Sequence, residues 1–394
     1  MNKEKKPGRI KSAVRRWLGV PISLTDGEFW AAYAGGQSAA GKSVTVDKAL
    51  QLSAVWSCVR LLSETIATLP VGFYEKTADG RQSANDHPLY ELLHNQPNAD
   101  MTAVEFWEMI MASLLLWGNA YAEIDRTGKR ITSLVPLRPE RMKVDLSKSG
   151  YPIYTYRDWP SGTSRNIDER DIMHIRAFST NGVMGLSPVS YARQTLGLAM
   201  ATDEASAKVF KNGMRPSGVL SMDQILKKEQ RNEVRESMVE QFSGSMNTGK
   251  MMVLEAGMKF QPVDLNPEDA QMLQSRAFNI EEICRWFRVW PGLIGHSAQG
   301  QTMWGSGVEQ MLIGFLTFSL RPWLTRIEQA IRKSLLAPGE RNKYFAEFSI
   351  EGLLRADSAA RAAFYSTMTQ NGLMTRNEAR QKENLQPKPG ADQL

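Results

Sequence analysis

Hydrophobic residues in the first third of the chain recur every three or four positions, the spacing of an amphipathic helix. This spacing predicts a helix over residues 47–69, which ends before Pro70 because a proline disfavours helical geometry in the preceding residue. A second helix is predicted over residues 102–118. At its start, Thr102 and Glu105 have the spacing of a capping box, in which the side chain of each bonds the backbone of the other.

The pattern then changes to the short, turn-bounded apolar runs that are typical of strands. Strands are predicted at residues 120–124, 131–137, 142–146, 153–156 and 171–175. Turn residues separate them at Arg126-Thr127-Gly128 and at Ser149-Gly150. We therefore expect residues 25–186 to form a mixed helix-and-sheet region, and the fold class to be α+β.

From Ser187 onward the pattern favours long helices. One is predicted from the Ser187 cap, with Pro188 at its first helical position, to residue 212, and its small residues allow close helix approach. The other covers residues 266–289 and has acidic residues in its first turn, where the helix dipole favours them. Its apolar residues form a narrow seam of the kind that packs helix against helix.

Residues 214–265, between these helices, are expected to form a compact insert. Its pattern predicts strands at 218–222, 251–254 and 259–263 and a helix at 227–242.

The last quarter of the chain is predicted to be mainly helical. Residues 291–305 are rich in glycine and polar side chains and are interpreted as a long loop, and a helix is expected over residues 306–336. Residues 353–394 form an amphipathic tail in which Thr375 and Glu378 again have capping-box spacing.

Composition narrows the class of protein. With 394 residues, 42% of them hydrophobic and 23% charged, the chain is globular and long enough for two or three domains. The net charge of +6 suits a polyanionic partner, but part of the excess lies in a basic arm at residues 1–24, which we interpret as flexible.

Cellular location is constrained by cysteine usage and by apolar run length. Cys58 and Cys284 lie in helical patterns and are expected to be reduced core thiols. The longest apolar run, residues 109–117, is too short to span a bilayer, and the start lacks the pattern of a secretory signal. We expect no membrane partner.

Eight segments of the chain follow, in one order, the pattern of a known family. They are SVTVDKALQLSAVWSCVRLLSETIATLPVGFY (from Ser43), HPLYELLHNQPN (from His87), LLLWGNAYAEI (from Leu114), SLVPLRPERMKV (from Ser133), GLSPVSYAR (from Gly185), FKNGMRPSGVL (from Phe210), RWFRVWPGLIG (from Arg285) and GLLRAD with GLMTRNEARQKENLQP (from Gly352). With them the chain resembles the bacteriophage portal family, the head-to-tail connectors of tailed phages, over roughly residues 41–387.

The resemblance implies a portal fold with named regions. After the arm at 1–24 these are a wing (25–186), a first stem helix (187–213), a small α/β clip (214–265), a second stem helix (266–290), a channel loop (291–305), a long helix returning to the wing (306–352) and a helical crown (353–394).

It also implies a function without catalysis or cofactor. Portal subunits form a ring of twelve at one capsid vertex, through which double-stranded DNA is packaged by the terminase motor and later ejected. The implied partners are other copies of the chain, DNA, the large terminase, head-tail connector or adaptor proteins, the major capsid protein and scaffold. The implied location is the virion, and the host cytoplasm during assembly.

Candidate residues follow from these regions. The polar loop side chains His296, Ser297, Gln299, Gln301 and Thr302 are predicted to face the channel, where sparse contacts would let a duplex slide. The charged clip helix offers a docking surface made of Lys227, Lys228, Arg231, Glu233, Arg235 and Glu236. The chain departs from the family near the loop, since Arg288 and Trp290 replace a glycine and a proline that are frequent there.

One motif suggests a different function, that of a nucleotide-binding enzyme. Residues 36–43, GQSAAGKS, match the phosphate-loop pattern, in which Gly36, Gly41, Lys42 and Ser43 would bind phosphates and magnesium. That loop requires a strand before it and a helix directly after it, whereas residues 44–46 are β-like. The alternative interpretation is a flexible glycine-serine linker.

Other catalytic patterns are not found in the sequence. The four histidines have no metal-ligand spacing and no nucleophile-elbow pattern occurs. His174 is expected to be a strand residue, and Glu281 and Glu282 are expected to pair with arginines on a helix surface.

Overall fold

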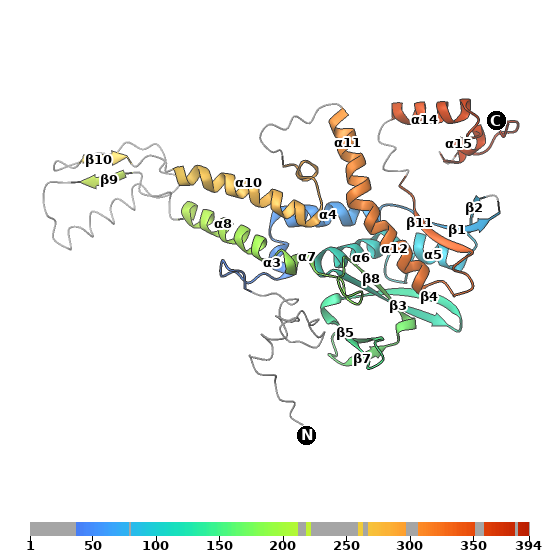
Figure 1. Cartoon of the computed structure of the whole chain (residues 1–394), viewed down its shortest axis with the longest axis horizontal. Helices are drawn as coiled ribbons and strands as arrows, with labels where there is room; N and C mark the ends of the chain where they lie inside the picture. The colour runs from blue at the N-terminus through green and yellow to red at the C-terminus, as the bar shows by residue number, and fades with distance from the viewer. Residues whose placement is uncertain are drawn as a thin grey trace, which may run out of the picture.

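A computed structural model describes residues 37–78, 80–211, 218–221, 259–262, 267–296, 306–350, 358–382 and 385–393. Within these residues the chain has an α+β fold, with a body that contains most of the strands (Figure 1). Two helices, α8 and α10, project from the body side by side, and two C-terminal helices lie at another corner.

The centre of the body is built around two packed helices, α4 (Ser53–Ala67) and α6 (Ala103–Trp117). The predicted capping box of α6 is confirmed, because Thr102 and Glu105 bond each other's backbone. The helix closes at Gly118 with φ 73°, and an added Cβ there would lie 2.2 Å from the carbonyl oxygen of Leu186. Glycine is therefore required both by conformation and by space.

The helix predicted over residues 47–69 is divided in two. A short helix, α3 (Val46–Ala49), precedes α4, and Leu52 between them has an extended backbone with ψ 121°. Leu52 is buried like the helical residues around it, so the apolar spacing continues through the break and does not reveal it. The second helix ends at Ala67, three residues before Pro70.

Three antiparallel sheets surround this centre. Their orders are β4-β3-β8, β5-β6-β7 and β11-β1-β2. The strands are β1 (Val71–Thr77), β2 (Gly80–Ser83), β3 (Asn119–Thr127), β4 (Arg130–Leu137), β5 (Met142–Leu146), β6 (Pro152–Arg157), β7 (Ser164–Ile167), β8 (Ile172–Arg176) and β11 (Tyr344–Phe348). The five strands predicted in this region are confirmed, whereas β1, β2, β7 and β11 were not predicted.

Two hydrophobic clusters hold the body together. The larger one joins α4 and α6 to the base of α10 and to α12, and includes Phe106, Trp107 and Ile327. The smaller one lies between the β3 and β5-β6 sheets around Tyr121 and Val144. Short helices complete the body: α5 (Pro88–His94) and the 3-10 turns η1 (Pro139–Arg141) and η2 (Glu169–Asp171).

The projecting pair consists of α8 (Arg193–Lys211) and α10 (Pro267–Phe287). A separate turn, α7 (Pro188–Tyr191), precedes α8 and is capped by Ser187, whose hydroxyl accepts from the Ser190 N–H. Two predicted strands of the insert are present as β9 (Gly218–Ser221) and β10 (Lys259–Pro262). They pair antiparallel and lie at the far end of the two helices in Figure 1. The predicted helix at 227–242 and strand at 251–254 lie outside the described residues.

The helix predicted over residues 306–336 contains a π-helical turn. It comprises α11 (Ser306–Gly314), the π turn η5 (Phe315–Leu320) and α12 (Arg321–Ser334). Pro322 has no N–H to donate to the carbonyl four residues earlier, and its ring would clash with that carbonyl in a regular helix. We attribute the wider turn just before it to this local conflict.

The described part of the C-terminal tail contains α14 (Ser358–Gln370) and α15 (Arg376–Lys382), and the predicted Thr375–Glu378 capping box is present. Among the described helices, none is long and apolar enough to cross a membrane.

Candidate functional site

Polar side chains tie the two projecting helices to each other. The indole Nε1 of Trp286 donates to the Thr195 hydroxyl across 3.3 Å, and Arg276 forms a 3.1 Å ion pair with Asp203. Both pairs join α8 to α10 over a long sequence separation. The two helices therefore act as one arm attached to the body.

Helix α10 ends in an unusual backbone turn. Arg288 has φ 55°, the left-handed conformation that favours glycine, and the next residue, Val289, donates its N–H to the Cys284 carbonyl across 2.9 Å. The sequence departure at Arg288 thus falls at a position whose backbone geometry favours glycine. The chain keeps the turn and accepts an arginine in a strained conformation.

The long helix packs directly against this turn. The hydroxyl of Ser319, in η5, donates to the Arg288 carbonyl across 2.5 Å. An added Cβ at Gly314 would lie 3.3 Å from the Trp290 ring, so the indole packs closely on the glycine. Arg288, Trp290, Gly314 and Ser319 form what we call the loop junction, because residues 291–305 leave it and the long helix returns to it.

Of the five predicted channel residues, only His296 is described. It follows the 3-10 turn η4 (Pro291–Ile294), and its backbone N–H donates to the Pro291 carbonyl across 3.1 Å. Its side chain is 18% exposed, and Nε2 lies 3.9 Å from a Glu281 carboxylate oxygen without a hydrogen-bond partner among the described residues. In the single chain His296 therefore lies against α10. Ser297, Gln299, Gln301 and Thr302 lie outside the described residues, as do Lys227, Lys228, Arg231, Glu233, Arg235 and Glu236.

The phosphate-loop match adopts a closed hairpin rather than a cradle. Gln37 pairs with Ser43 as a β-bridge, and the N–H groups of Ser38, Gly41 and Lys42 all donate to acceptors inside the hairpin. No helix begins at Ser43, because α3 starts at Val46. A phosphate loop needs free N–H groups and a helix N-terminus at that point.

The hairpin is instead fastened to α8. The Ala39 N–H donates to the Gln194 side chain across 2.8 Å, and the Lys42 ammonium pairs with Glu204. Ser38 is buried against Gly197, where an added Cβ would lie 2.2 Å from the serine oxygen. Gly36 lies outside the described residues. These contacts give residues 37–43 a structural role. The segment is fastened to α8 and is not the flexible linker that the sequence suggested.

The partly buried His174 has a structural environment, as expected from its strand. His174 in β8 stacks on Tyr121, and its Nε2 lies 3.0 Å from the Asn119 Oδ1, which accepts the proton. Nδ1 then accepts from the Tyr154 hydroxyl across 3.2 Å. Burial, with nearby Arg176 and Lys333, holds the His174 pKa well below its usual value, so this side chain is neutral.

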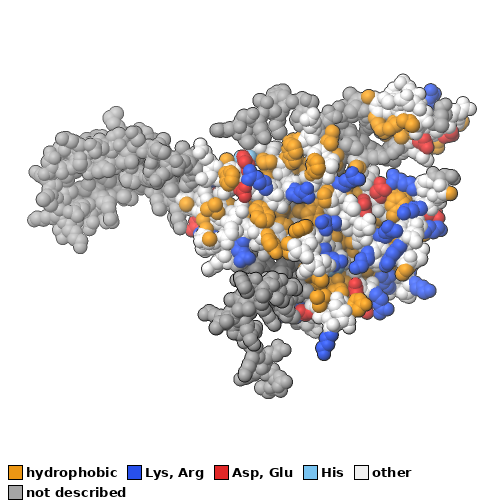
Figure 2. All heavy atoms as spheres, in the orientation of Figure 1, with side chains coloured by type: hydrophobic (Ala, Val, Ile, Leu, Met, Phe, Trp, Pro, Cys, Tyr) orange, Lys and Arg blue, Asp and Glu red, His pale blue; other side chains and the backbone are white. Residues whose placement is uncertain are grey.

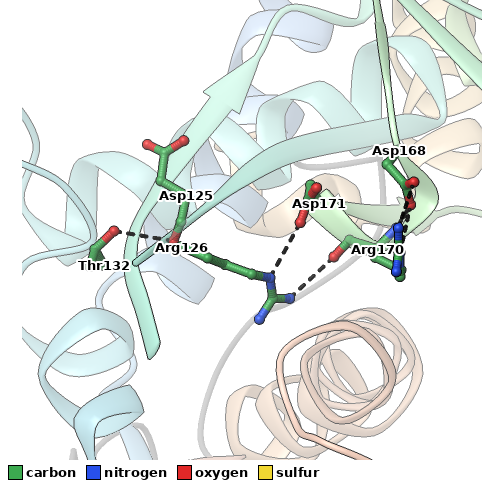
Figure 3. Close-up of polar contacts among 6 residues, drawn as sticks. All are labelled: Asp125, Arg126, Thr132, Asp168, Arg170 and Asp171. Atoms are coloured by element: carbon green, nitrogen blue, oxygen red, sulfur yellow. Dashed lines mark hydrogen bonds and ion pairs between the residues drawn. The ribbon is translucent and has the colours of Figure 1, made fainter. Parts of the chain in front are cut away.

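The exposed charges near β3 pair with one another (Figure 3). Arg126 reaches from β3 to the Asp171 carboxylate at 3.3 Å and to the Arg170 carbonyl, while Arg170 folds back onto Asp168. Hydrogen bonds from Arg170 lower the Asp168 pKa to about 2. These contacts fasten η2 to the β3-β4 hairpin and pair each of the two arginines with an aspartate. No cluster of three or more possible metal ligands is found among the described residues.

Two kinds of side chain occupy different parts of the molecular surface (Figure 2). Hydrophobic side chains gather over the middle, where α4, α10 and α11 meet in Figure 1, and Lys and Arg side chains spread over the strand-containing part. Large hydrophobic residues that are 40% to 60% exposed occur on α10 (Phe278 and Trp286), just before η4 (Trp290) and on the long helix (Leu312, Ile313 and Phe318). We call these six residues the apolar face.

Comparison with known proteins settles the family. The family model described as phage portal protein matches residues 53–384. The chain belongs to the phage portal protein family. The resemblance found in the sequence is confirmed, and the function is that of a portal protein.

Relatives of this portal protein span most of its length. It is 36% identical over 354 residues to the portal protein of Enterobacteria phage HK97, covering 89% of this chain and 82% of that protein. It is 34% identical over 363 residues to the probable portal protein of Streptomyces phage phiC31, covering 90% and 79%.

Solved structures share the fold. A chain from the neck of an empty gene transfer agent particle, computed with C6 symmetry, matches with a TM-score of 0.64 and 25% identity, covering 93% of this chain and all of that one. An HK97-family portal protein from Corynebacterium diphtheriae matches with a TM-score of 0.54 and 15% identity, covering 80% and 99%. The second likeness concerns the fold alone.

The loop junction was only partly visible in the sequence. The sequence marks Arg288 and Trp290 as departures from the family pattern. Gly314 and Ser319 carry no specific signal, because an isolated glycine or serine in a helical pattern is common. The proline two residues after η5 was the one available indication of an irregular turn.

Proposed function

We propose that this portal protein forms a closed ring of twelve subunits at one capsid vertex, through which double-stranded DNA is packaged by the terminase motor and later ejected. The main support is the family match over residues 53–384 together with the α8–α10 arm and the β9-β10 pair. A relative of similar fold occurs in the neck of a native gene transfer agent particle computed with C12 symmetry.

We assign the regions of the portal to the described elements. Residues 25–186 are the wing, α8 and α10 are the stem, 214–265 the clip, 291–305 the channel loop and 353–394 the crown. The arm formed by α8 and α10 suits a stem because Trp286–Thr195 and Arg276–Asp203 hold the helices together.

Subunit contact is assigned to the apolar face. The six side chains come from neighbouring elements and are exposed in the single chain, and apolar patches of this kind mark interaction sites. A ring closes by head-to-tail contact, in which one surface of each subunit meets a different surface of the next. Burial of the apolar face against a neighbour would supply the hydrophobic part of that contact.

The channel contacts are assigned to the loop that leaves the junction. His296, Ser297, Gln299, Gln301 and Thr302 are polar and mostly uncharged, so they would touch phosphates without holding a duplex in place. His296 lies beside Glu281 in the single chain, so its assignment to the channel requires the side chain to move away from α10.

The remaining partners follow from the family. The clip helix with Lys227, Lys228, Arg231, Glu233, Arg235 and Glu236 would dock the large terminase during packaging and head-tail connector proteins afterwards. Major capsid protein and scaffold would contact the ring during assembly. The virion would be its final location, and no catalytic step is assigned to the chain.

A complementation experiment tests this function. A phage that lacks its own portal gene is supplied with this chain, and nuclease-protected DNA in the heads is measured. We expect protected DNA with the wild-type chain and none without it. A variant with Gln299→Ala and Gln301→Ala should assemble but package less, whereas the exposed control Tyr151→Ser should package normally. Equal protected DNA with and without the chain would contradict the proposal.

A further inference from the structure

The two cysteines of the chain meet in the core. Cys58 lies in α4 and Cys284 in α10, and their sulfur atoms are 3.9 Å apart. The side chains are 0% and 1% exposed, and 226 positions separate them in the sequence. Both thiols are free. Folding alone therefore brings together the only two residues of the chain that can form a disulfide.

The pair has unequal chemistry. The hydrogen bond with Cys284, together with burial, raises the pKa of the Cys58 thiol, whereas acceptance of that hydrogen bond lowers the pKa of Cys284. The thiolate is the reactive form of cysteine. The lowered pKa favours Cys284 as the thiolate of the pair.

The sulfur atoms are near enough for side-chain rotation to bring them together. A sulfur–sulfur bond measures about 2.05 Å, so the two atoms must approach by about 1.9 Å. Rotation of each side chain about its Cα–Cβ bond moves its sulfur atom. The two side chains can therefore each supply part of this movement. The two sulfur atoms already form a direct hydrogen bond.

We propose that Cys58 and Cys284 are a latent disulfide site, which on oxidation fastens the base of α10 to α4. With the azo oxidant diamide, the Cys284 thiolate adds to the N=N bond and that adduct takes up a proton. The Cys58 sulfur then attacks the Cys284 sulfur, the new S–S bond forms and the S–N bond breaks. Both electrons and both protons of the two thiols end on the hydrazine product.

The position of the site gives the bond a mechanical consequence. Cys284 lies one turn before Arg288, and its carbonyl already accepts the Val289 N–H at the loop junction. A cross-link at this point would fix the end of α10 to the most buried helix layer of the body. Motion of the arm relative to the body would then be restricted until a reductant restores the thiols.

Oxidation of the assembled full-length protein tests the site. Purified protein is treated with diamide, unreacted thiols are blocked with N-ethylmaleimide after denaturation, and peptides are analysed by mass spectrometry. We expect both thiols to disappear together, a Cys58–Cys284 peptide pair, and a chain that stays monomeric on a non-reducing denaturing gel. Dithiothreitol should restore both thiols. Recovery of two alkylated cysteines, or of disulfide-linked dimers, would overturn the proposal.

A second measurement tests the mechanical consequence. Hydrogen exchange of the α10 amides should slow on oxidation and recover on reduction, while α14, which lies far from the site in Figure 1, should be unchanged. The Cys58→Ser variant serves as the matched control, because it should form no disulfide and show no change with diamide. Unchanged exchange of α10 in the fully cross-linked wild-type chain would show that the bond does not restrict the arm.

Discussion

The hydroxyl of Ser319 donates a hydrogen bond to the carbonyl of Arg288 across 2.5 Å. This bond joins the π turn of the long helix to the strained residue that ends α10. The two irregular backbone segments on either side of residues 291–305 are thus bonded to each other. Changes at either segment are expected to affect both.

Removal of the hydroxyl tests this connection. Ser319 is buried, so Ser319→Ala leaves the Arg288 carbonyl without this donor and should lower the free energy of unfolding by about 1–2 kcal/mol. The midpoint of urea unfolding would measure the change. Thr317→Ala, at an exposed position of the same π turn, is the control and should stay within about 0.5 kcal/mol of wild type. Equal midpoints for the two variants would argue against a structural role for the bond.

Glycine at position 288 should stabilise the chain. A non-glycine residue with φ 55° carries backbone strain of about 1–2 kcal/mol, which Arg288→Gly removes. The net gain should be about 0.5–1 kcal/mol, because glycine also gives the unfolded chain more freedom. Gln274→Gly, exposed inside α10, should have the opposite sign and cost about 1 kcal/mol. If both substitutions lowered the free energy of unfolding, the left-handed backbone at Arg288 would not be a source of strain.

The partly buried His174 should make stability depend on pH. The His174 pKa is lowered in the folded chain, so the unfolded chain binds a proton more tightly. Stability should therefore be constant above pH about 6.5 and fall below it, by up to about 1.4 kcal/mol per pH unit, until the folded pKa is reached. His174→Gln keeps a donor and an acceptor but does not titrate. The free energy of unfolding is measured from pH 8 to pH 5 for both proteins. Its decrease toward low pH should be smaller in the variant, and an equal decrease in both would rule out His174 as the source.

The position of the hairpin at residues 37–43 should depend on Gly197 of α8, against which Ser38 packs. Alanine in place of a helical glycine normally stabilises by about 1 kcal/mol. At Gly197 the new Cβ would lie 2.2 Å from the Ser38 oxygen, so Gly197→Ala should displace the hairpin and speed hydrogen exchange at residues 38–42. Gly339→Ala, which meets nothing within 4 Å, is the control. Unchanged exchange in the Gly197 variant would mean that the hairpin does not rely on this contact.

Sequence patterns predicted most of the body correctly because its signals are local. The capping box at Thr102, the cap at Ser187 and the strand at Met142–Leu146 each depend on residues that are close in the sequence. Strands β1 and β11 were not predicted. They pair with each other across more than 260 positions, and only the fold reveals that pairing.

The candidate site was less predictable for a related reason. Only the family pattern marks Arg288 as unusual in the sequence. Its left-handed backbone depends on the fold around it, which the sequence pattern does not indicate. The partner atoms on Ser319 and Gly314 come from a helix that looks regular in the sequence. The phosphate-loop letters, in contrast, were fully visible, but the hairpin geometry and the Lys42–Glu204 pair give them a different role.

The mass and symmetry of the purified protein test the central proposal most directly. Native mass spectrometry, with electron-microscope averages of end-on views, should reveal a hollow closed ring of about twelve subunits and roughly 530 kDa. Phe318→Glu on the apolar face should weaken that ring, whereas Tyr151→Asp should not. A chain that stays monomeric or dimeric, even when produced together with its capsid and scaffold proteins, would contradict the account.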